Sequence, residues 1–143
     1  MRLLLLFILG LGGSAGAQSL GVVCPSSSAK PVVCTIISSV IGASGVQWVI
    51  STNVPNSGMS VSSRRPDKSA ANNGGRMLMF GMNSTPMPLG ILASVSISFP
   101  SGWKCPGNSP CLTVTLSLPQ ACVNNHSVRL TASPASATVR VPK

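Results

Sequence analysis

Carboxylate side chains are almost absent from this sequence. Asp67 is the only acidic residue among 143, and there is no Glu. A glycosidase needs two carboxylates flanking the scissile bond, whereas calcium loops and two-metal nucleases need several around their ions. None of these sites can be assembled from a single carboxylate. The sequence therefore excludes most metal-dependent and acid–base hydrolytic chemistry.

Histidine is equally scarce, because His126 is the only one. One imidazole cannot form a multi-histidine zinc site or a facial triad of two histidines and a carboxylate. A serine triad could recruit only His126 and Asp67, and no serine of the mature chain stands in a nucleophile elbow. We interpret His126 as a turn residue after Asn124 and Asn125, and Asp67 as part of a solvated loop. The predictions are no enzyme activity, no metal and no cofactor.

Long hydrophobic runs are missing, except for a short one at the N-terminus. Met1 and Arg2 form a positive start, Leu3 to Leu11 are apolar, and Ala15-Gly16-Ala17 is typical of a cleavage site. A membrane span needs about 20 apolar residues. A lipid anchor at Cys24 is disfavoured because the preceding Val22-Val23 lacks the expected small residue. We expect a signal peptide over 1–17, no transmembrane segment, and a secreted single domain over 18–143.

Positive charge dominates what remains. The full chain carries a net charge of +9, and removal of Arg2 with the signal would leave +8. A basic surface attracts anionic partners. Arg64 and Arg65 have Lys68 and Arg76 nearby. We interpret Arg64 to Lys68 as a solvated loop whose charges contribute little to stability, and the alternative is a site for anionic surface polymer or lipid headgroups. The charges are too sparse, and lack interleaved aromatics, for nucleic acid to be expected.

Five cysteines survive signal removal, and export permits disulfides. Cys105 and Cys111 flank a short loop bounded by prolines, and Cys24 and Cys34 flank a possible hairpin. We predict these two pairs to be bonded, which leaves Cys122, either buried or pairing between molecules. No two cysteines have the close spacing of a zinc site.

Alternation with a period of two residues is the dominant pattern in the mature chain, and it is typical of strands with one buried face. Arg76 to Met82 is instead apolar on both faces, which suits a central strand covered on both sides or one whose outer face packs under a loop. The predicted apolar faces are Ile91, Ala93, Val95, Ile97 and Phe99; Leu112, Val114, Leu116 and Leu118; Val46, Trp48 and Ile50; Val128, Leu130 and Ala132; and Ala137, Val139 and Val141.

Turn-forming residues separate these runs, so strands recur every 8 to 15 residues or so, as in a sandwich or jelly roll. Thr85 to Leu89 contains two prolines and allows at most one short helical turn. The predicted fold class is all-β, with two sheets. The predicted turns are Gly42 to Gly45, Asn53 to Gly58, Asn72 to Gly75, Ser101-Gly102 and Asn124-Asn125.

An ordered series of motifs resembles a cohesin domain. It consists of Gly45-Val46-Gln47-Trp48-Val49-Ile50, then Gly74-Gly75 leading to Leu78-Met79-Phe80-Gly81-Met82-Asn83, then Leu89-Gly90-Ile91-Leu92-Ala93-Ser94-Val95. The resemblance is greatest to stand-alone, exported cohesin-like proteins of bacteria, and it implies a jelly roll of about nine strands that binds rather than catalyses. Cohesins bind dockerin modules through a sheet face rich in polar and acidic groups. Because this chain has almost no acid, we transfer no partner contacts.

Aromatic residues are too few for a strip that stacks on sugar rings. Trp48, Phe80 and Phe99 fall in strand patterns, which favours core positions. Trp103 lies in a predicted loop beside Lys104, so these two are candidate ligand contacts together with Arg64 and Arg65. The sequence thus predicts a non-catalytic secreted module that binds a dockerin-type protein or a polysaccharide. The alternative is a basic extracellular matrix protein that binds anionic polymers.

Overall fold

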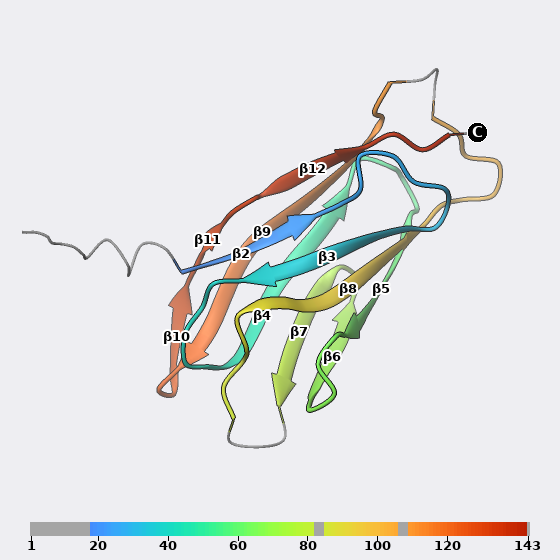
Figure 1. Cartoon of the computed structure of the whole chain (residues 1–143). Coiled ribbons are helices and arrows are strands. Elements are labelled where there is room, and N and C mark those ends of the chain that lie inside the picture. Colours follow the sequence, from blue (N-terminus) through green and yellow to red (C-terminus); the bar gives the residue numbers. More distant parts are fainter. Residues whose placement is uncertain (1–17, 82–84, 106–108, 143) are drawn as a thin grey trace, which may run out of the picture.

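The computed structural model describes residues 18–81, 85–105 and 109–142, and every regular element in these ranges is a β-strand. The strands form two sheets that pack face to face as a sandwich (Figure 1). The all-β, two-sheet prediction is therefore confirmed. The predicted signal peptide over 1–17 lies outside the described residues. Within those residues, no helix is long and apolar enough to cross a membrane.

The first sheet has six strands in the order β10-β9-β4-β7-β6, and β12 pairs with the other half of the long strand β9. All of these pairings are antiparallel. The strands are β4 (Ala43–Thr52), β6 (Lys68–Asn73), β7 (Arg76–Gly81), β9 (Leu112–Val123), β10 (His126–Arg129) and β12 (Ser136–Val139).

The second sheet has five strands in the order β11-β2-β3-β8-β5. The β11–β2 pairing is parallel and the others are antiparallel. Because β10 and β12 belong to the first sheet while β11 belongs to the second, the end of the chain ties the two sheets together along one edge (Figure 1). The strands are β2 (Ser19–Val23), β3 (Val32–Ser38), β5 (Gly58–Ser63), β8 (Gly90–Ser98) and β11 (Thr131–Ala132).

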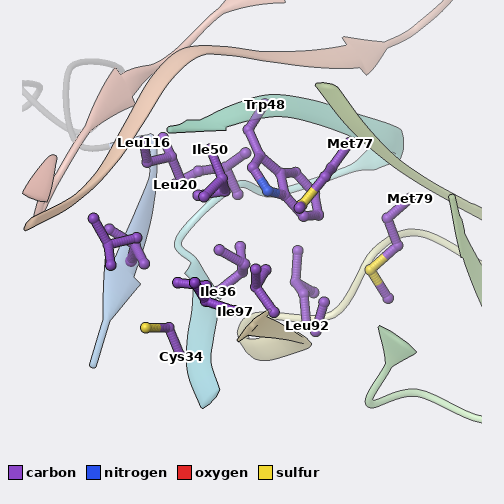
Figure 2. Packing of buried hydrophobic residues seen from close by; sticks show 14 of the residues in the cluster. Leu20, Cys34, Ile36, Trp48, Ile50, Met77, Met79, Leu92, Ile97 and Leu116 are labelled. Atoms are coloured by element: carbon purple, nitrogen blue, oxygen red, sulfur yellow. The ribbon is translucent and has the colours of Figure 1, made fainter. Parts of the chain in front are cut away.

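The core lies between the sheets. Trp48 and Ile50 from β4 and Met77 from β7 face Ile36 and Leu92 from the opposite sheet, and all five side chains are fully buried (Figure 2). The predicted apolar face of β4 is thus confirmed. Leu130, Val139 and Val141 are also buried, as their alternation predicted, whereas Val128, Ala132 and Ala137 are half-buried.

Two bulges overturn part of the predicted alternation. In β8, Ile36 pairs with Ala93 and Ile37 with Ile91, so Leu92 is an extra residue. Leu92 is buried and Ile91 is 43% exposed, which reverses the prediction for Ile91. In β9, the register with β4 shifts between Gln47 and Val49, and Leu118 is 64% exposed with a φ of +51°. An inserted residue resets which side chains face the core, so both predictions fail at the insertion.

Other local predictions have mixed outcomes. Asn124 and Asn125 form the tight turn between β9 and β10, both with positive φ, and His126 opens β10 rather than belonging to that turn. Gly42 to Gly45 is not a turn as a whole, because β4 begins at the buried Ala43. The described part of the segment before β8, from Thr85 to Leu89, contains no helical turn.

Strand β7 lies inside its sheet, between β4 and β6, but it is not covered on both sides as its apolar run predicted. Met77 and Met79 point into the core and are fully buried. Leu78 and Phe80 alternate with them, so they face outward: Leu78 is 43% exposed and Phe80 is half-buried. The predicted core position of Phe80 is therefore wrong, and the outer face of this sheet carries apolar surface. Met82 lies outside the described residues.

Candidate functional site

Both predicted disulfides are present. Cys24–Cys34 joins the end of β2 to the neighbouring strand β3, with Cα atoms 4.3 Å apart, and Cys105–Cys111 closes the loop before β9, with Cα atoms 5.7 Å apart. Cys122 has no disulfide and is half-buried in β9. Disulfides of this kind are typical of proteins that fold in an oxidising compartment.

Trp103 is not the exposed ring that its loop position predicted. The indole is half-buried and stacks on Phe99, with ring centroids 4.6 Å apart and an interplanar angle of 11°. The Lys30 ammonium lies 5.6 Å from the indole centroid and donates a hydrogen bond to the Trp103 carbonyl. The Phe99 ring therefore covers one face of the indole, and that face is closed to a sugar. The adjacent Lys104 is exposed.

The two predicted arginines behave differently. Arg65 is half-buried, and its guanidinium donates to the carbonyls of Ile91 (2.8 Å) and Leu89 (3.1 Å), so it holds the start of β8. Arg64 is exposed and donates to the Ser94 hydroxyl at 3.2 Å on the outer face of the five-stranded sheet. Of this pair, Arg64 is the one whose side chain is open to a partner.

Lys68 contradicts the prediction of a solvated loop over Arg64 to Lys68. Its side chain is 1% exposed. The ammonium donates to the Thr85 carbonyl (2.7 Å) and hydroxyl (2.9 Å), and it lies 3.4 Å from the Asp67 carboxylate. Burial of a cation is costly unless it is paired and hydrogen-bonded. The single carboxylate of the chain, which stands in the β5–β6 turn as predicted, therefore has a structural partner.

A groove of about 350 Å³ opens on the outer face of the six-stranded sheet. Its floor crosses β9, β4 and β7, whose residues Gln120, Gln47 and Leu78 stand side by side in the strand register. Gly45, also on the floor, has no side chain to fill this space. The groove is lined by Gly45, Val46, Gln47, Leu78, Gln120, Ala121, Cys122, Asn125 and Ser127.

Side-chain amides occupy the centre of the groove. Gln47 Nε2 donates to Gln120 Oε1 at 2.8 Å, and the Ser127 hydroxyl donates to the same oxygen at 3.4 Å. Gln47 Oε1 and Gln120 Nε2 make no hydrogen bond with any residue that the structure describes, so one amide oxygen and one amide NH2 group are open to a ligand. Beside them, Leu78 offers apolar surface. Pockets that combine apolar surface with a few placed polar groups are suited to binding.

A smaller hollow of about 40 Å³ adjoins the amide pair on the other side. Gln47 and Gln120 line it too, together with Arg76 of β7. Val49 of β4 and Leu118 of β9, which lie at the register shift between these two strands, also line this hollow. Sequence reasoning missed this whole face. The available signal was the set of outward positions on β4, β7 and β9, which carry Gln, Leu and Arg where an ordinary solvated face would carry mixed charges.

No three His, Cys, Asp or Glu residues among 18–81, 85–105 and 109–142 lie close enough to hold a metal ion. His126 is exposed at the start of β10, whereas Asp67 is engaged with Lys68 in the turn before β6. The arrangement offers hydrogen bonds, apolar contact and positive charge to a ligand.

The cohesin-like motifs fall on β4, on β7 with the turn before it, and on the first part of β8, whereas Met82 and Asn83 lie outside the described residues. These strands belong to both sheets, so the motifs contribute to the core as well as to the groove. The chain matches no protein-family model and no curated protein, and the resemblance to cohesins therefore rests on these motifs alone.

Proposed function

We propose that this protein is a non-catalytic, exported binding domain of the cohesin-like type, which binds a protein module or a polysaccharide outside the cell. The observation that carries the proposal is the groove on the outer face of the six-stranded sheet, with its Gln47–Gln120 pair and the exposed Leu78. The N-terminal sequence and the two disulfides support export.

The composition supports binding rather than turnover. One carboxylate and one histidine leave few routes to general acid–base catalysis. The groove offers amides, a hydroxyl and apolar surface, which are groups that recognise a ligand without activating it. Cohesin-like jelly rolls, which this chain resembles, are binding modules.

A matched pair of substitutions tests the site. Leu78→Ser alters the groove, and Val33→Ser alters a similarly exposed aliphatic residue (47%) on the outer face of the five-stranded sheet. The purified oxidised protein is immobilised and presented in parallel with secreted proteins and with a polysaccharide panel. We expect retention of a ligand that Leu78→Ser weakens and Val33→Ser leaves unchanged. Equal loss in both variants, or no ligand in either arm, contradicts the proposal.

A second candidate function is that of a basic matrix protein that binds anionic polymers through its net charge. The exposed Arg64 and the predicted mature charge of +8 favour it. In this case Arg64→Ser with Arg65→Ser weakens binding to an anionic polymer, added salt weakens it further, and Leu78→Ser has no effect. The two functions therefore differ in which substitution matters.

A further inference from the structure

We propose that the groove binds a carboxylated polysaccharide, held between Arg76 and Arg129. This inference rests on the proposed function and names the ligand class of the same site. The basic side chains point to this ligand class, because four of the eight in the described residues are engaged within the protein and two of the others lie on the groove face.

Four basic side chains have partners inside the fold. Lys30 is bound at Trp103, Arg64 at Ser94, Arg65 at the start of β8, and Lys68 at Thr85 and Asp67. The guanidinium groups of Arg76 and Arg129, by contrast, make no hydrogen bond or ion pair with any residue in the described ranges. They are thus available to an external anion.

Both arginines lie on the groove face. Ser127 of β10 lines the groove, and Arg129, two residues further along the strand, points the same way and is paired in register with Gln120. On the other side, Arg76 alternates with the buried Met77, so it faces outward, and it lines the small hollow together with Gln47. Arg129, Gln120 and Gln47 therefore stand in register across three neighbouring strands, and Arg76 follows on the fourth strand, displaced by two residues along β7 from Leu78, the register partner of Gln47.

The spacing of this row suits an extended ligand. Strands lie about 4.8 Å apart and residues about 3.4 Å apart along a strand, so three strand spacings and the two-residue offset of Arg76 separate the Cα atoms of the two outer arginines by about 16 Å. Arginine binds carboxylates through paired, charge-assisted hydrogen bonds, and the amides between them suit neutral hydroxyl groups. No acidic side chain lies among these residues, because the only one in the sequence, Asp67, is paired with Lys68.

The groove favours a sugar chain over an acidic peptide. An extended peptide gains its affinity by pairing with a free sheet edge, but β9, β4 and β7 each have a neighbour on both sides along the groove. Their backbone groups are engaged in the ladders, and side chains form the floor. Sugar hydroxyls can be satisfied by Gln47, Gln120 and Ser127, and Leu78 can pack against C–H groups.

The test uses polygalacturonate, its fully methyl-esterified form and polyglutamate as probes. The ester keeps the sugar backbone and removes the charge, whereas polyglutamate keeps the charge and removes the sugar. We expect the oxidised protein to bind polygalacturonate, with an affinity that falls as salt is added, and to bind the other two at least about tenfold more weakly. Equal binding of polyglutamate, stronger binding of the ester, or no binding of polygalacturonate overturns the inference.

A matched pair of double substitutions locates the site. Arg76→Gln with Arg129→Gln removes two charges at the groove, and Arg64→Gln with Arg140→Gln removes two exposed charges elsewhere. We expect the first pair to weaken polygalacturonate binding about tenfold or more, and the second to have a much smaller effect. Equal weakening by both pairs overturns the inference. If Leu78→Ser abolishes binding of a neutral or protein ligand while the arginine pair does not, the proposed function stands and only the ligand class is wrong.

Discussion

Asp67, the only carboxylate in the chain, lies 3.4 Å from the ammonium of Lys68, whose side chain is buried. Thr85 completes the arrangement, since its hydroxyl also donates to Asp67 at 3.1 Å. This triad joins the start of β6 to the segment that leads into β8. Asp67, the only side chain that could have served as the acid of a catalytic triad, thus pairs with Lys68 and Thr85 within the fold.

Removing the carboxylate should destabilise the protein. Asp67→Asn leaves the buried ammonium with hydrogen bonds but without a counter-charge, and we expect a loss of about 1–2 kcal/mol, less than for a fully buried pair because Asp67 is partly exposed. Urea unfolding measures the change. Lys68→Met is the control, because it removes charge and desolvation cost together and should cost less. The role of the pair is disproved if Asp67→Asn unfolds at the parental midpoint.

Arg65 should matter to stability and Arg64 should not. Arg65→Ala removes the donors to the Leu89 and Ile91 carbonyls, and we expect it to cost about 1–2 kcal/mol. Arg64→Ala removes one exposed contact to Ser94 and should change stability by less than about 0.5 kcal/mol. Thermal unfolding of the two variants side by side separates them. Equal melting temperatures of the two variants would contradict a structural role for Arg65 and would support the solvated loop that the sequence predicted.

The Leu118 backbone should be stabilised by glycine. A bulky residue with a φ of +51° is strained, and Leu118 is also exposed, so its side chain contributes little burial. Leu118→Gly should raise the free energy of unfolding by up to about 1 kcal/mol. Leu89→Gly, at an exposed leucine where no positive φ occurs, should lower it instead. A loss of stability in both variants would argue against the bulge geometry at Leu118.

Trp48 should be indispensable to the core. Replacement by Ala removes its packing between the sheets and should cost about 3–5 kcal/mol. Acrylamide quenching of single-tryptophan variants provides a second check: with Trp103 replaced by Phe, the emission of Trp48 should be protected, and with Trp48 replaced by Phe, the emission of the half-buried Trp103 should be quenched more strongly. A Trp48→Ala variant that folds normally would place this residue outside the core.

Much of the fold could be predicted from alternation alone. Val46, Trp48 and Ile50 face the core because the register shift opposite them inserts its extra residue in β9 and not in β4, and the first part of β9 faces the core because it precedes that insertion. The prediction failed where a bulge inserts a residue, at Leu92 and around Leu118, since no local composition marks such an insertion. Strands β5 and β6 were not predicted, because they consist largely of Ser, Asn and Ala and few of their side chains are buried, so they show no apolar alternation.

The candidate site was harder to predict because its residues are brought together by the register in which three strands pair. Gln47, Leu78 and Gln120 are far apart in the sequence and become neighbours only when β7, β4 and β9 pair. The burial of Lys68 depends likewise on Thr85, which no sequence pattern connects to it. The disulfides were predictable because each joins cysteines close in sequence, across a loop or between adjacent strands.

The most direct measurement of the central claim is NMR titration of the isotope-labelled protein with a ligand that it retains. If the outer face of the six-stranded sheet is the binding site, the side-chain amide resonances of Gln47 and Gln120 and the backbone amide of Gly45 should shift together and saturate with one affinity. Resonances of Thr35 and Ser96, on the outer face of the other sheet, should stay in place. Shifts confined to Thr35, Ser96 and Arg64, with the groove unchanged, would contradict the account.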